Sequence, residues 1–439
     1  MLSLPKISSY DPSTTSDGSL DPLGLYMISE RLSSRLAPGV RERMSHPRYL
    51  TASALGAHIC SPFYDAYASD GVSPAYQVYE WHIVEGFTSK YLRSDPDQIQ
   101  GLPGIQKAED AINSDLALRS SRYLKTASVF GFHGVYRTLA TELRVVSDDY
   151  RLQELGNELL TALQEEKNLQ GIYVGDGDWN KKVELFRAAI KDSLEKGEVA
   201  RIWSWDIHRE FAEILRPNQI GSKEANIILN ALRSESEPFR KQMLDLMLSD
   251  SGREVWRTTR SEKSFLSHLK RSASEDLKSL IDTIEHYEIF AKTFQDAFDA
   301  CEYAMSRTGK SSLETLAALP AVTRAAKEMP HVFTELEKGL SMFDVGHTFL
   351  KIFSTFENRY SPKDWVTAMW EHHKKIQRAK GKLGKRTWFD RTEDGVFRSY
   401  AVSNNKKEPQ ISDEFLHYYR VQPLWSFLVN MKLVEDGKS

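Results

Sequence analysis

The sequence predicts a mainly α-helical protein with a large helical bundle and a small β-hairpin near the C-terminus. Beyond residue 180 apolar residues recur at helical spacing, and the clearest stripe, about eight turns long, comprises Leu277, Leu280, Ile281, Ile284, Tyr287, Phe290, Phe294, Phe298, Cys301 and Met305. Helix-start signals also recur, namely Ser272 with Glu275, Ser311 with Glu314, and Ser361 with Pro362 and Asp364. The 439 residues, 41% of them hydrophobic, suffice for two or three domains.

The expected elements follow one another along the chain in four parts. Residues 1–19, rich in Ser, Asp, Thr and Pro, indicate a disordered tail. An N-terminal helical domain over residues 20–170 includes a buried helix around residues 76–87, and a helical bundle spans residues 180–380. Residues 381–439 supply a hairpin within 387–402, turning at Glu393-Asp394-Gly395, and a closing helix that starts near Pro423.

Composition excludes several classes of protein. Lys and Arg total 58 against 61 Asp and Glu, so a nucleic-acid surface has to be a local patch. Two cysteines without metal-type spacing indicate neither a disulfide framework nor a zinc site, which fits a reducing cytoplasm. No run approaches the roughly 18 apolar residues of a membrane span, and the N-terminus lacks the pattern of a secretory signal. We therefore expect a soluble cytoplasmic protein without membrane contact.

Residues 119–160 carry the most informative pattern. Gly131 and Gly134 bracket a turn before a helix on which Val135, Leu139 and Leu143 share one face. A short extended pair then flanks the tip at Ser147-Asp148-Asp149, and a helix follows with the pattern Leu-x-x-Gly-x-x-Leu-Leu. This order resembles the winged helix-turn-helix of bacterial transcription regulators, so the resemblance adds a winged-helix region to the predicted fold.

The resemblance implies contact with DNA. The helix face opposite the apolar one and the basic residues just upstream offer donors for phosphates or base edges, namely Arg122, Lys125, His133, Arg137, Thr138, Thr141 and Arg144. The acidic tip Asp148-Asp149 departs from the Arg or Lys that these regulators often place there, which puts contact between the wing and the DNA backbone in doubt. A winged helix can also serve as a packing or protein-binding module.

Residues 371–386 form a second basic segment. Against a single Glu371 it carries Lys374, Lys375, Arg378, Lys380, Lys382, Lys385 and Arg386, and Trp388 and Phe389 follow. Such a segment suits a polyanion, because cations displace counterions and rings can stack on unpaired bases. The alternative is a helix end whose cations favour the helix dipole, with both rings buried in the hairpin.

Other motifs are better explained by structure than by chemistry. Residues 304–311 end in Gly309-Lys310-Ser311 like a phosphate-binding loop, but a helical stripe precedes them, so Gly309 indicates a helix C-cap. Residues 176–180 imitate the start of a calcium loop but lack its Gly and bidentate Glu, which favours a turn. The sequence thus indicates no cofactor, no metal and no placed nucleophile.

The whole chain resembles the non-catalytic helical proteins encoded beside helicases and nucleases in bacterial antiphage defence islands. The resemblance implies an accessory subunit that engages DNA and protein partners from neighbouring genes. The alternative is an adaptor or scaffold subunit without DNA contact. An enzyme whose site is assembled from scattered residues is the third hypothesis.

Overall fold

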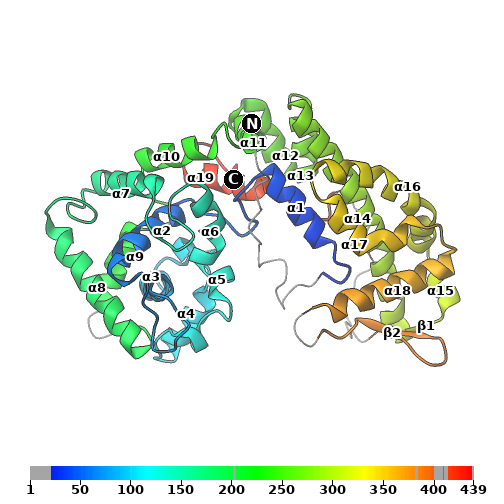
Figure 1. The fold of residues 1–439 in the computed structure, drawn as a ribbon, viewed down its shortest axis with the longest axis horizontal. Coiled ribbons are helices and arrows are strands. Elements are labelled where there is room, and N and C mark those ends of the chain that lie inside the picture. The colour runs from blue at the N-terminus through cyan, green and yellow to red at the C-terminus, as the bar shows by residue number, and fades with distance from the viewer. Residues whose placement is uncertain are drawn as a thin grey trace. The chain divides into compact units, whose positions relative to one another are not determined.

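The computed structural model describes residues 21–99, 101–200, 204–380, 384–399, 409 and 414–437. Most of these residues lie in helices and the strands form one small antiparallel sheet, which confirms the prediction of a mainly α-helical fold (Figure 1). The predicted tail, residues 1–19, lies outside the described residues.

The chain forms two compact units, each built from two separate stretches. One, which we call the α14 unit, combines the chain up to Leu36 with Thr258–Tyr419. The other, the α3 unit, combines Ala37–Arg257 with the chain from Arg420 onward. The boundaries of these two units differ from the domain boundaries that the sequence predicts at residues 170–180 and 380.

The α14 unit is organised around one long helix, α14 (Glu275–Thr308), with α16 (Pro320–Met342) packed beside it. Every member of the predicted apolar stripe on α14 is fully buried. Phe290 and Phe294 contact rings from the helices that follow, which closes an aromatic core. The remaining helices are α1 (Tyr26–Leu36), α13 (Glu262–Leu269), α15 (Leu313–Ala317), α17 (Gly346–Phe353), η5 (Ser354–Glu357) and α18 (Pro362–Arg378).

The predicted hairpin is present in the α14 unit. Strands β2 (Phe389–Arg391) and β3 (Phe397–Ser399) pair antiparallel, with Phe389 opposite Ser399. A third strand, β1 (Lys310–Ser311), joins the other side of β3 and was not predicted. It directly follows Gly309, whose φ of 74° ends α14 in a left-handed C-cap, as the sequence predicted.

The α3 unit packs helices against a nearly fully buried α3 (Ala75–Tyr91), which confirms the predicted buried helix near residues 76–87. Helix α9 (Ser204–Ile214) lies closest to α3. This approach requires Gly86 on α3, because a Cβ at that position would lie 2.5 Å from the His208 carbonyl oxygen on α9. The other helices are α2 (Arg48–Ile59), α4 (Ile105–Asn113), α5 (Ala127–Phe130), α6 (Phe132–Glu142), α7 (Glu154–Glu166), α8 (Asp178–Lys196), α9 (Ser204–Ile214), α10 (Ser222–Leu232), α11 (Pro238–Leu248), α12 (Asp250–Thr259) and α19 (Val421–Asn430), with 3-10 turns η2 (Ser61–Phe63), η3 (Pro96–Ile99) and η4 (Ser120–Arg122).

The closing helix α19 belongs to the α3 unit. It confirms the apolar helix predicted near Pro423, and it packs on α6 through the stacked rings of Phe427 and Tyr136. Asn430 Nδ2 also donates to the Ser45 carbonyl at 3.1 Å. The last helix of the chain is therefore part of the core formed by its first half.

Candidate nucleic-acid interface

Helices α5, α6 and α7 occupy the region that resembles a winged helix. The expected wing between α6 and α7 is a single antiparallel bridge, Val146 to Leu152. Asp149 at its tip accepts from Arg151 Nε at 2.6 Å. The extended pair predicted on either side of the tip is thus limited to one bridge between α6 and α7.

Helix α6 has one buried face and one half-buried face. Val135, Leu139 and Leu143 are buried, as the spacing predicts. The opposite side is at most half-exposed, since none of the eleven residues of α6 is exposed. Tyr136 faces inward, and its hydroxyl accepts the N–H groups of Ser45 and His46 at 2.9 Å each. A helix held in this way lacks the projecting face that enters a major groove.

The arginines of this region bind the protein's own acceptors. Arg137 donates to the Asp148 carbonyl at 2.9 Å, and Arg122 donates to the Ala117 carbonyl at 3.1 Å. Arg144 does not lie on the helix face. It follows the C-cap of α6 with a φ of 59° and pairs with Glu154 at 3.0 Å. That pair is exposed, so it holds Arg144 weakly.

The remaining predicted DNA contacts near α6 divide between core and surface. His133 is only 3% exposed and its Nδ1 binds the buried Glu80, which corrects its place among the DNA-contacting residues. The Oγ1 of Thr141 is buried without a hydrogen-bond partner, and Thr138 is half-buried. In the described part of the chain, Lys125 is the member of this group that is exposed and forms no ion pair. The sequence could not foresee the burial of His133, because Glu80 is 53 positions away.

The second basic segment is exposed in part, and its Lys380 is half-buried and donates to the Asp21 carbonyl. Lys375 and Arg378 are exposed at the end of α18, and Arg386 is exposed after it, while Lys385 is half-buried. Among the described residues neither Lys375 nor Arg378 forms an ion pair. Lys374 is held against the helix, with Nζ 2.7 Å from Glu371 and 4.0 Å from the centre of the Trp370 ring. Lys382 lies outside the described residues.

The aromatic residues after this segment pack inward. Phe389 is fully buried and stacks on His373, with ring centres 5.5 Å apart, while Trp388 is half-buried against Phe298. Stacking of Phe389 on a nucleic-acid base is therefore excluded, which corrects that part of the polyanion hypothesis. The alternative reading, burial in the hairpin, holds for Phe389.

Two histidines of α18 bind main-chain carbonyls at the start of the α14 unit. His372 Nε2 donates to the Leu23 carbonyl at 2.7 Å. His373 Nδ1 donates to the Pro22 carbonyl at 2.8 Å and its Nε2 accepts the Trp388 N–H at 2.9 Å. Burial lowers the pKa of each to about 4, so both rings are neutral at pH 7.

A pair of buried histidines and a serine lie deep in the α3 unit. His82 on α3 contacts His208 on α9 through Nδ1 and Nε2, and the other nitrogen of His82 lies 2.8 Å from Ser193 Oγ on α8. All three residues are at most 2% exposed, and burial lowers the pKa of His82 to about 3. Without access for a substrate, this row of a serine and two histidines joins three helices and offers no reachable nucleophile.

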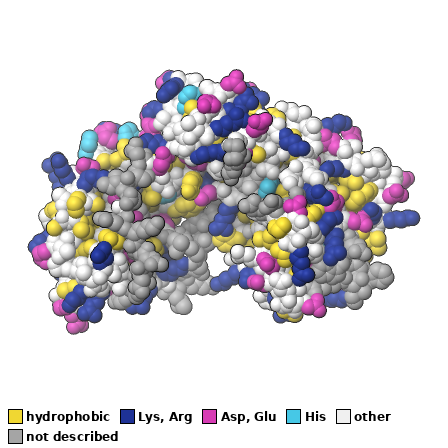
Figure 2. All heavy atoms as spheres, turned by 180° about the vertical axis from the view of Figure 1, so that it is seen from behind, with side chains coloured by type: hydrophobic (Ala, Val, Ile, Leu, Met, Phe, Trp, Pro, Cys, Tyr) yellow, Lys and Arg dark blue, Asp and Glu magenta, His cyan; other side chains and the backbone are white. Residues whose placement is uncertain are grey.

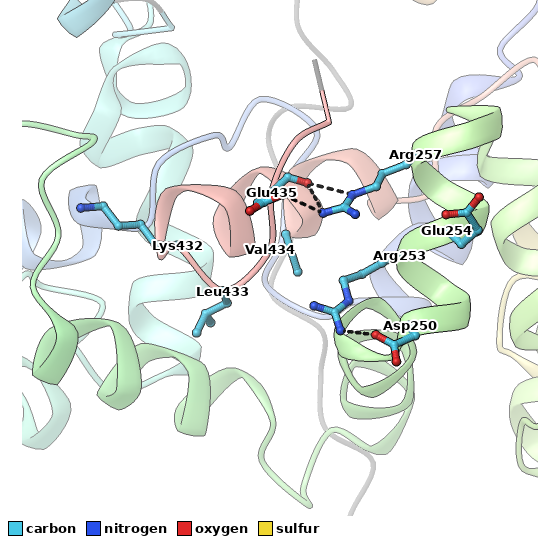
Figure 3. Close-up of a pocket in the computed structure, with 8 residues that line it drawn as sticks. All are labelled: Asp250, Arg253, Glu254, Arg257, Lys432, Leu433, Val434 and Glu435. Atoms are coloured by element: carbon cyan, nitrogen blue, oxygen red, sulfur yellow. Dashed lines mark hydrogen bonds and ion pairs between the residues drawn. The ribbon is translucent and has the colours of Figure 1, made fainter. Parts of the chain in front are cut away.

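One surface cleft was missed by the sequence analysis. It measures about 490 Å³ and lies between α12 and the segment after α19 (Figure 3). Arg253 and Arg257 line one side and residues 432–435 the other. The spacing of the two arginines by four residues was visible in the sequence, but the facing segment lies almost 180 residues further along the chain, as the contact of Arg257 with Glu435 shows.

No family model, curated protein or solved structure matches this chain. Within the part of the chain that the structure describes, no helix has both the length and the apolar character to cross a bilayer. Among the same residues, His, Cys, Asp and Glu do not gather in groups of three or more that could hold a metal ion. Arguments about function therefore depend on the arrangement of this chain's own residues.

Proposed function

We propose that this chain binds the phosphate backbone of double-stranded DNA through the end of α18 and the segment that follows it. In this proposal it acts as a non-catalytic accessory subunit of a multi-protein bacterial system, such as an antiphage defence system. One observation carries the proposal. Lys375 and Arg378 on α18 are exposed and form no ion pair among the described residues, whereas the arginines around α6 bind the protein's own oxygens.

The charge at this site favours a polyanion. Lys375 and Arg378 lie one turn apart and Arg386 follows, with Glu371 as the acidic residue of the segment and already paired to Lys374. The negative end of the α18 dipole also stabilises these cations, so their presence does not require a ligand. Over the face drawn in Figure 2, basic and acidic side chains are interspersed.

The proposed binding does not depend on base sequence. Helix α6 has no exposed residue and supplies no recognition surface, and the buried Phe389 supplies no stacking platform. What remains is attraction between cations and phosphates, which gains its free energy largely from counterion release. We therefore expect similar affinities for unrelated duplexes and a steep decrease in affinity with salt.

The test measures binding of a labelled DNA duplex to the full chain across a salt series. Replacing Lys375 and Arg378 by alanine removes two phosphate contacts, so the slope of log affinity against log salt should decrease in magnitude by about 2. The matched control, Arg137→Ala with Arg144→Ala, removes two cations that are paired with the protein's own oxygens and should leave affinity and slope unchanged.

Two outcomes would contradict the proposal. The first is the reverse pattern, in which the α6 pair controls the slope and the α18 pair does not; it would restore groove reading by α6. The second is no duplex binding at low salt. That result would favour the adaptor function, which the burial of α6 as a packing element also supports, and copurification with a neighbouring-gene product after nuclease treatment would then identify the partner.

A further inference from the structure

The cleft beside α12 brings two arginines to one place. Arg253 and Arg257 stand one helical turn apart and both extend from α12 toward the segment after α19, whereas Lys432 extends away from them (Figure 3). Leu433 and Val434 are the apolar residues of the lining, and the other lining residues are charged. Such a lining selects a small charged ligand over an apolar one.

The present partners of the two arginines are exposed acidic residues. Arg257 donates through Nε and Nη2 to the main-chain carbonyl of Glu435 at 3.2 Å each, and its Nη2 lies 3.7 Å from the Glu435 carboxylate. Arg253 donates through Nη2 to Asp250 at 2.6 Å and through Nε to the Ser249 carbonyl at 3.3 Å. The side chains of Glu435 and Asp250 are 93% and 100% exposed, so water competes for both carboxylates.

The geometry fits a tetrahedral oxyanion better than a carboxylate. One guanidinium fork can satisfy both oxygens of a carboxylate, which leaves a second arginine unused. A phosphate group has enough oxygens to accept from two forks at once. Its charge at pH 7 also exceeds that of the Glu435 carboxylate, the acidic group that it would replace on Arg257.

We propose that this cleft binds a phosphate group, and that Glu435 is an internal competitor which the phosphate displaces from Arg257. Arg253 and Arg257 then share the bound group, each donating to different oxygens. Residues 432–435 line the side of the cleft opposite the arginines, and Glu435 holds Arg257 until the phosphate replaces it. This site lies in the α3 unit and is independent of the DNA-binding segment on α18.

Isothermal titration of the full chain with inorganic phosphate, at constant ionic strength, tests the proposal. Saturable binding is expected, and Glu435→Gln should tighten it about 1.4- to 5-fold, because an exposed ion pair contributes about 0.2–1 kcal/mol. Arg257→Ala should weaken it about 10- to 150-fold, the equivalent of a charged hydrogen bond of about 1.5–3 kcal/mol. Glu435→Gln changes an exposed side chain, so it remains informative even if Arg257→Ala unfolds.

Controls separate this site from general attraction to cations. Arg151→Ala removes an exposed arginine of the same unit that pairs with Asp149, and phosphate affinity should not change. Tighter binding of a nucleoside monophosphate than of free phosphate would assign the cleft to a phosphorylated compound, and equal binding to the ion. Absence of saturable binding, or equal affinity in Glu435→Gln and the unmodified chain, would overturn the proposal.

Discussion

Tyr136 shows how one buried polar atom can hold a helix in place. Its ring is 1% exposed and its hydroxyl accepts two main-chain N–H groups, from Ser45 and His46. Burial raises its pKa to about 12, so the hydroxyl is neutral at pH 7. Without this oxygen both N–H groups would lose their acceptor inside the protein, and buried donors of this kind are costly.

We therefore expect Tyr136→Phe to lower the free energy of unfolding by about 1–3 kcal/mol, the desolvation cost of an unsatisfied buried group. Urea denaturation followed by circular dichroism measures this change. Tyr67→Phe in the same unit is the control, because Tyr67 is 59% exposed and its variant should match the unmodified chain. Equal stability of the two variants would show that water replaces the missing acceptor.

Residue-level prediction succeeded where the cause was local. Val135, Leu139 and Leu143 were assigned to a buried face from spacing alone, and all three are buried. It failed for His133 because burial of that ring depends on Glu80, which only the fold brings close. The prediction that Arg144 lies on the helix face was wrong for a local reason. Helix α6 ends before this residue, which takes a left-handed conformation that spacing cannot reveal.

At the scale of elements, capping serines mark where helices begin. Ser361 caps α18 as predicted, with Oγ accepting the Asp364 N–H at 3.3 Å. The predicted cap at Ser311 lies one residue early, because Ser311 is in β1 and Ser312 caps α15. The start of α14 is at Ser274 and not at Ser272. The sequence therefore predicts the presence of a start better than its position.

Ser361→Ala should lower the free energy of unfolding by about 0.5–2 kcal/mol, because the first turn of α18 loses a side-chain acceptor. Thermal unfolding measures the effect. The comparison variant is Ser341→Ala on α16, where an exposed serine donates to its own helix at the Glu337 carbonyl and alanine is the better helix former. Loss of stability in Ser341→Ala but not in Ser361→Ala would rule out capping as the cause.

At the scale of the whole molecule, both units contain buried neutral histidines. Burial lowers the pKa of His82 to about 3, and those of His58, His372 and His373 to about 4, while the pKa of His208 is also lowered. In the unfolded chain each ring takes up a proton near pH 6.5. Between about pH 6.5 and pH 4 the unfolded state thus binds more protons than the folded state.

Stability is therefore expected to be constant above about pH 6.5 and to decrease as the pH falls, with each such histidine contributing up to about 1.4 kcal/mol per pH unit. Buried Glu224, whose pKa is raised by burial, opposes this trend as a single group. Urea midpoints measured at pH 7 and pH 5 test the prediction. Equal midpoints at both pH values would contradict the prediction.

Which helices belong to which unit also depends on the packing of the whole molecule. From the sequence we expected domains that follow one another along the chain, but α1 joins the α14 unit and α19 joins the α3 unit. An amphipathic helix reports which of its faces is buried and not which helices cover it. The partner of a helix at either end of a chain is therefore beyond what periodicity can predict.

The sequence by itself determined the helical class, the apolar stripe of α14, the hairpin and the closing helix. Each of these follows from spacing and turn chemistry within a few residues. Only the tertiary structure decided which charged groups face solvent, because contacts far apart in the sequence, such as those of His133 with Glu80 and of Arg257 with Glu435, set burial and pairing. Burial is a property of the packed chain, so the sequence alone cannot show which candidate residues a ligand can reach.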